Sequence, residues 1–195
     1  ITWTNVKAFL KTYFDTLYST YSDNILMNGA FDIWQMGTSF TGLTHLDITA
    51  DRWVYGDSNS TAVFTAEQNS DTPHNNVNWS HKTTVTTDDT SIATDQQAHY
   101  RYGIEGPDFR KIFHKTVTFS FWVKSTTIGT YCIAFYEETG GVTMVKEYEI
   151  NVADTWEEKE ITIDMTTGTT PDFSEGEIGI KIRFGLYVGA TYQTT

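Results

Sequence analysis

The chain has 195 residues, of which 39% are hydrophobic and 15% aromatic, which suffices for one sizeable domain with an appendage. Its formal net charge of −12 argues against nucleic acid and anionic membranes as partners, and favours neutral glycans or cations such as calcium. No apolar run approaches the ~18 residues of a membrane span, so no membrane insertion is expected, and the single Cys132 excludes a disulfide within the chain.

Residues 1–23 are predicted to form a short coiled-coil-like α-helix that serves oligomerisation. Apolar residues recur there at alternating spacings of three and four, which is a heptad seam. Phe9 and Phe14 widen the stripe, and a wide stripe suits a bundle of three helices better than a pair. The helix could pack on its own domain or on copies of itself, and the aromatic stripe favours a homotrimer. The predicted oligomerisation residues are Trp3, Val6, Leu10, Tyr13 and Leu17.

Residues 24–195 are predicted to form an antiparallel β-sandwich, because many short alternating segments are separated by turn residues. No βαβ rhythm appears, which argues against a parallel sheet. The clearest segment is 115–124, where apolar and polar residues alternate strictly. Phe119 and Phe121 on its apolar side are expected to be nearly fully buried. Trp122 falls on the opposite side, where it is either covered by a neighbouring chain or used to hold a ligand.

The later segments continue the same pattern. Gly140-Gly141 is expected to form a hairpin, and residues 109–115 a short helical or irregular bridge. Residues 186–195 look like a strand that stops abruptly. A sandwich often returns its final strand beside its first, so the domain is expected to be truncated at its C-terminus. Further alternating segments span residues 81–87, 99–104, 131–136, 144–152, 156–163 and 178–184.

No pattern of catalytic residues stands out, so a non-enzymatic function is expected. The five histidines are not spaced as ligands of one metal on one strand or helix. The acidic pairs Asp88-Asp89 and Glu137-Glu138 are adjacent loop or hairpin residues, whereas glycoside hydrolysis needs two carboxylates facing each other across a sugar. The chain has neither a glycine-rich phosphate loop nor a nucleophile elbow.

Aromatic and basic residues are the better candidates for function. Trp122 and Tyr136 lie opposite the core-forming residues of their strands, and Lys181 also falls on an outward position. If these strands share one sheet, they form a face with two rings for sugar stacking and several hydrogen-bond donors. The alternatives are that a partner subunit covers this face, or that binding occurs in the loops 69–78 and 166–177. The predicted glycan-binding residues are Trp122, Tyr136, Arg101 and Arg183.

Several stretches resemble the jelly-roll domains in the distal parts of phage tail fibres and related virion fibres, which are similar to carbohydrate-binding modules. Residues 1–18 resemble the helical segment that precedes fibre head domains in trimeric phage proteins. Family members usually carry further sequence beyond the point that matches the end of this chain. The stretches that carry the jelly-roll resemblance are residues 24–35, 37–41, 50–53, 103–106, 117–125, 153–157 and 184–194.

The resemblance implies a jelly roll in a tail or capsid fibre of a virion, acting outside the host cell. Its partners would be other fibre, baseplate or capsid proteins and a host-surface glycan. The alternatives are a purely structural fibre or adaptor module that serves assembly, and an accessory domain of a depolymerase. Such sandwiches often hold a structural calcium ion, and Asp32, Asp51 and Asp57 are available as ligands.

Overall fold

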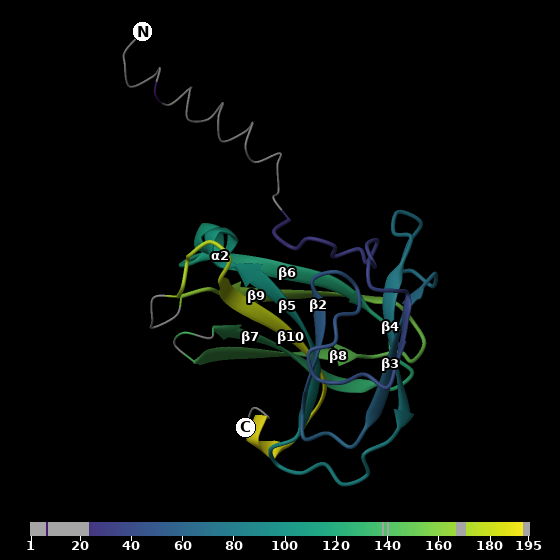
Figure 1. Ribbon diagram of the computed structural model, residues 1–195. Coiled ribbons are helices and arrows are strands. Elements are labelled where there is room, and N and C mark those ends of the chain that lie inside the picture. Colours follow the sequence, from purple (N-terminus) through teal and green to yellow (C-terminus); the bar gives the residue numbers. More distant parts are fainter. Residues whose placement is uncertain (1–6, 8–23, 138, 140, 167–170, 193–195) are drawn as a thin grey trace.

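The computed structural model describes residues 7, 24–137, 139, 141–166 and 171–192 (Figure 1). The predicted oligomerisation residues lie outside this described part, so the trimer stays a prediction. These residues are Trp3, Val6, Leu10, Tyr13 and Leu17.

The described part of the chain is mainly β, with antiparallel sheets and one short α-helix. The largest sheet has five strands in the order β2-β5-β10-β7-β8, and two smaller sheets have the orders β1-β3-β4 and β6-β9. The five-stranded sheet comprises β2 (Trp53–Ser58), β5 (Gln97–Glu105), β10 (Ile178–Val188), β7 (Gly129–Glu137) and β8 (Val142–Ile150). The smaller sheets comprise β1 (Ser39–Thr41), β3 (Val63–Asn69), β4 (Ser80–Thr87), β6 (Thr116–Val123) and β9 (Glu157–Asp164). The helix α2 (Gly106–Ile112) follows β5, and the 3-10 helix η1 (Ala190–Tyr192) follows β10.

The two smaller sheets pack on different parts of the inner face of the five-stranded sheet. Near β3 and β4, the ring of Phe64 lies 5.8 Å from that of Tyr55 on β2. Near β6, the ring of Phe119 lies 5.7 Å from that of Phe135 on β7. Figure 1 shows β6 beside α2 and β3–β4 on the other side of the molecule. The core therefore lies between one continuous sheet and a second layer built from two separate pieces.

The predicted alternation of residues 115–124 is confirmed in β6. The apolar positions of the strand are partly buried, the polar positions are exposed, and Trp122 is 38% exposed. The prediction that Phe119 and Phe121 are nearly fully buried is wrong, because both are only partly buried. The reason is tertiary: both rings border a cleft between β6 and β4 that no described strand fills.

The end of the chain also differs from the prediction. β7 and β8 pair antiparallel up to Glu137 and Val142, while Gly140 of the turn predicted at Gly140-Gly141 lies outside the described residues, and α2 covers residues 109–112 of the predicted bridge over 109–115. Residues 186–188, by contrast, continue β10 rather than start a new strand, and the chain then turns into η1. A register shift between Gly185 and Tyr187 allows Tyr187 to turn its ring toward Phe64, with ring centroids 6.1 Å apart. The prediction of a separate strand is therefore wrong for residues 186–192, and residues 193–195 lie outside the described part of the chain.

Candidate functional site

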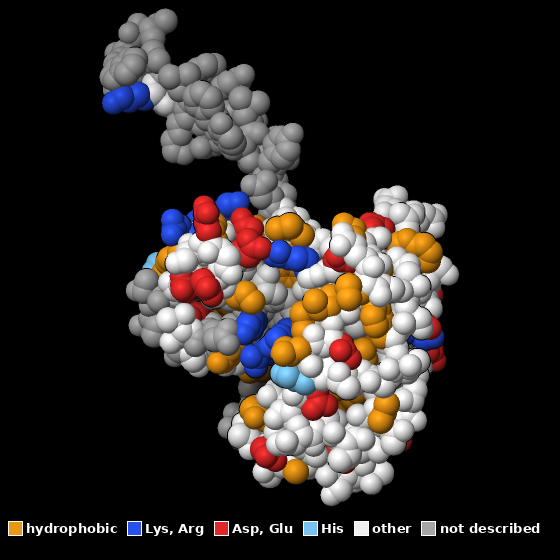
Figure 2. Space-filling model, viewed as in Figure 1, with side chains coloured by type: hydrophobic (Ala, Val, Ile, Leu, Met, Phe, Trp, Pro, Cys, Tyr) orange, Lys and Arg blue, Asp and Glu red, His pale blue; other side chains and the backbone are white. Residues whose placement is uncertain are grey.

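Three of the four predicted glycan-binding residues come together on the outer face of the five-stranded sheet. Arg101 on β5 lies directly opposite Arg183 on β10 in the strand register. The guanidinium carbon of Arg183 lies 4.1 Å from the ring centroid of Tyr136 on β7. Lys181, two residues before Arg183 on β10, is the register partner of Tyr136. Figure 2 shows Lys and Arg side chains gathered over this sheet.

This cluster is basic in a protein whose formal net charge is −12. Arg101 and Arg183 place two guanidinium groups directly opposite one another in the strand register, which concentrates positive charge on this face. Guanidinium groups also donate several hydrogen bonds in a fixed geometry, which suits carboxylates and vicinal hydroxyls. The face therefore presents guanidinium donors next to an aromatic ring, with the guanidinium of Arg183 stacked on Tyr136.

His99 lies on β5 beside the basic cluster, and no sequence motif indicated a role for it. It is 6% exposed, and neither ring nitrogen has a hydrogen-bond partner among the described residues. Burial, followed by the charges of Arg183 and Arg101, lowers the pKa of His99 to about 3, so the imidazole is neutral. The ring occupies the space above Gly56 of β2, where an added Cβ would overlap its Nε2. Only glycine at that position leaves room for the buried ring.

Trp122, the fourth predicted residue, lies on a different surface. It belongs to β6, which is not part of the five-stranded sheet, so the stacking platform predicted from Trp122 and Tyr136 together is not formed within this chain. Instead Trp122 contacts His74 of the loop between β3 and β4, with ring centroids 5.8 Å apart. In the same loop, a carboxylate oxygen of Asp71 lies 2.6 Å from Nζ of Lys124. The hydrogen bond from this ammonium group lowers the pKa of the Asp71 carboxyl.

Asp71 also ties a second tryptophan to this surface. Trp156 donates a 2.9 Å hydrogen bond from Nε1 to Asp71, so the loop lies beside both β6 and the start of β9. The loop 69–78, which the sequence offered as an alternative binding region, therefore lies against Trp122. We treat this as a second candidate surface, separate from the basic cluster.

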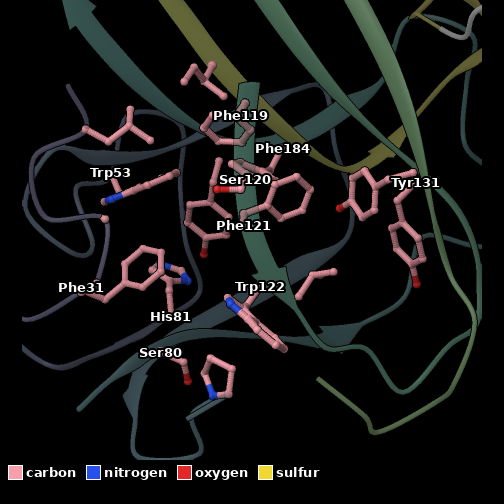
Figure 3. Close-up of a pocket in the computed structure, with 18 of the residues that line it drawn as sticks. Phe31, Trp53, Ser80, His81, Phe119, Ser120, Phe121, Trp122, Tyr131 and Phe184 are labelled. Atoms are coloured by element: carbon pink, nitrogen blue, oxygen red, sulfur yellow. The ribbon is translucent and has the colours of Figure 1, made fainter. Parts of the chain in front are cut away.

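A cleft of about 940 Å³ opens between β4 and β6. Figure 3 shows Phe119, Phe121 and Trp122 of β6 on one side, with Phe31 and His81 across from them. The ring of Phe121 lies 5.2 Å from that of Phe184 and 5.1 Å from that of Tyr148, both of the five-stranded sheet. The cleft is thus apolar and reaches the floor of the sandwich. No local sequence pattern reveals it, because its walls come from strands far apart in the chain.

The predicted calcium ligands do not form one group. Asp51 accepts a 2.7 Å hydrogen bond from the backbone N–H of Gln35, and Asp57 accepts one of 3.2 Å from that of Ser60. Asp32 is exposed. Among the described residues, no three His, Cys, Asp or Glu side chains lie together as a potential metal site. Calcium binding stays a prediction from the resemblance.

The comparisons with known proteins add little. No protein-family model matches the chain, and no curated protein matches it. Among solved structures, the enzymatically active domain of tailspike protein 4 of bacteriophage CBA120 is similar at 18% identity, with a TM-score of 0.43. The similar part covers 71% of this chain and 18% of that one. Within the described residues, no helix has both the length and the apolar character needed to cross a bilayer.

Proposed function

We propose that this chain is a non-enzymatic jelly-roll domain of a virion fibre, carried on a phage tail or capsid as a homotrimer. Its role is to recognise a glycan on the host surface through the outer face of the five-stranded sheet. The sequence resemblance to distal fibre domains supports the fibre assignment. The main support for this binding site is that Arg101, Arg183 and Tyr136 lie close together on three adjacent strands, β5, β10 and β7.

The chemistry of this face fits a sugar. A pyranose presents C–H groups on one face, which pack on an aromatic ring, and hydroxyls at its edge, which need fixed polar partners. Tyr136 supplies the ring; the guanidinium of Arg183 covers one face of it, 4.1 Å from the ring centroid, so a sugar would pack on the opposite face or along the edge of this stacked pair. Arg101 stands opposite Arg183 and widens the set of donors. An acidic sugar would bind best, because two guanidinium groups face it.

A glycan array with the purified chain identifies a ligand, and titration calorimetry of point variants locates its site. Arg101→Gln is expected to weaken binding roughly 10-fold or more, since a hydrogen bond to a charged group contributes about 1.5–3 kcal/mol. Tyr136→Ala is expected to weaken binding as well, because it removes the ring on which the sugar packs. Arg110→Gln is the matched control, because Arg110 lies on α2 beside Phe173, away from this face. Affinity is expected to be unchanged in the control.

The same experiment separates the alternatives. Loss of affinity in Trp122→Ala, with Arg101→Gln unaffected, would move the site to the surface formed by Trp122, Asp71 and Trp156. Absence of saturable binding to any glycan would favour the purely structural role in virion assembly. In that case Trp122→Ala or Tyr136→Ala would instead disturb association between subunits.

A further inference from the structure

The outer face of the five-stranded sheet has an apolar side next to its basic cluster. Ile48 forms a β-bridge with Val54 of β2, and Val54 lies opposite Arg101 of β5 in the strand register. Arg101 in turn lies opposite Arg183 of β10. Side chains of residues that are directly opposite in antiparallel strands lie on the same face of a sheet. The four side chains therefore form one row, with two aliphatic groups at one end and two guanidinium groups at the other.

The aliphatic end of this row is exposed to solvent. Ile48 is 48% exposed, and Leu46, two residues earlier, is 52% exposed. Val54 is half-buried, whereas its neighbours Trp53 and Tyr55 are buried in the core. A single exposed apolar side chain is ordinary on a protein surface, but neighbouring ones rimmed by polar residues are typical of interaction sites. A sugar hydroxyl above Ile48 would lose hydrogen bonds to water without replacement, so this end fits a methyl group better than a hydroxyl.

The basic end of the row suits a carboxylate. Arg101 takes part in none of the ion pairs found among the described residues. A guanidinium group holds a carboxylate through two parallel hydrogen bonds, which a neutral hydroxyl cannot match. Figure 2 shows hydrophobic side chains beside the Lys and Arg side chains of this face. Adjacent strands lie about 4.8 Å apart, so Arg101 lies about 5 Å from Val54 and about 10 Å from Ile48 across the sheet.

We propose that the ligand of this face is an acidic sugar that also carries an acetyl group. Its carboxylate contacts the guanidinium groups of Arg101 and Arg183, and the methyl group of its acetyl substituent packs on Val54 and Ile48. Carbon 6 of a hexuronic acid is the carboxylate itself, so a methyl group on such a sugar has to come from an acylated amine or hydroxyl. This inference rests on the proposed glycan binding, and it adds the chemical class of the sugar and the residues that select it.

Four methyl glycosides on one scaffold test the two substituents: those of glucose, glucuronic acid, N-acetylglucosamine and N-acetylglucosaminuronic acid. Each is titrated into the chain, and binding is followed by NMR through the methyl signals of isoleucine and valine. The acetylated acid is expected to bind most tightly and to shift the methyl signals of Ile48 and Val54. Removing its acetyl group should weaken binding about 4-fold, equivalent to about 0.8 kcal/mol for one buried methyl group.

Two substitutions remove the two contacts separately. Ile48→Ser should abolish the preference for the acetylated acid over glucuronic acid. Arg101→Gln should abolish the preference for glucuronic acid over glucose. Ile128→Ser is the matched control, because Ile128 is 60% exposed in the connection between β6 and β7. Both preferences are expected to be unchanged in this control.

Other results overturn the inference, and they differ from a failure of the proposed function. Equal affinity for the acetylated and the plain acid, or a preference for the acetylated acid that survives Ile48→Ser, would refute the acetyl contact while leaving glycan binding on this face intact. Absence of binding by all four glycosides would overturn both the inference and the proposed glycan recognition.

Discussion

The open cleft makes a quantitative prediction about two phenylalanines of the same core. Phe135 of β7 is 0% exposed, whereas Phe121 of β6 is only partly buried at the cleft. Their rings both belong to the aromatic cluster around Phe119, at 5.7 Å and 5.5 Å from its ring. The pair therefore compares one substitution, phenylalanine to alanine, in closed and open surroundings.

Phe135→Ala is expected to lower the free energy of unfolding by about 3–5 kcal/mol, because it removes a fully buried ring and leaves a closed cavity. Phe121→Ala is expected to cost only about 1–2 kcal/mol, since part of its ring is already in water and the space left behind opens into the cleft. Urea denaturation followed by tryptophan fluorescence measures both values, provided that the two variants keep the same m-value.

Equal costs for the two variants in the 195-residue chain would refute this reasoning, because they would mean that the cleft is closed in solution. A cost near zero for Phe121→Ala would mean that β6 faces the other way.

Three further predictions concern assembly, pH and backbone packing. Leu10→Asp should dissociate the predicted trimer in sedimentation experiments, and a monomeric wild type would contradict it. Burial lowers the pKa of His81 to about 4, below its unfolded value of about 6.5, so the unfolded state binds more protons and the free energy of unfolding should fall as the pH drops from about 6.5 to 4. His81→Gln should reduce this dependence of stability on pH, and an unchanged dependence would exclude His81 as its source. A Cβ on Gly106 would lie 2.6 Å from the backbone of Phe173, so Gly106→Ala should lower the free energy of unfolding by about 1–3 kcal/mol, measured by thermal denaturation. A Cβ on Gly29 would have its nearest neighbour 3.9 Å away, so the control Gly29→Ala should leave the melting temperature nearly unchanged, and similar melting temperatures for the two variants would count against this packing.

The sequence by itself determined the local properties of the strands. The alternation in residues 115–124 predicted which side of β6 faces the core and that Trp122 faces outward, and both are confirmed. The outward positions of Arg101 and Arg183 were predictable for the same reason. Side-chain direction in a strand has a period of two residues, which the backbone sets without reference to the rest of the fold.

The tertiary structure alone decided which strands are neighbours. Arg101 and Arg183 meet because β10 inserts between β5 and β7, a pairing between segments about 80 residues apart that no local period encodes. Trp122 and Tyr136 have the same outward direction but belong to different sheets, so the predicted joint platform fails. Phe121 has the alternation of a core residue, yet it is only partly buried because its ring borders the cleft between β4 and β6. Burial is set by everything that packs around a side chain, whereas the alternation of one strand fixes only the direction in which that side chain points.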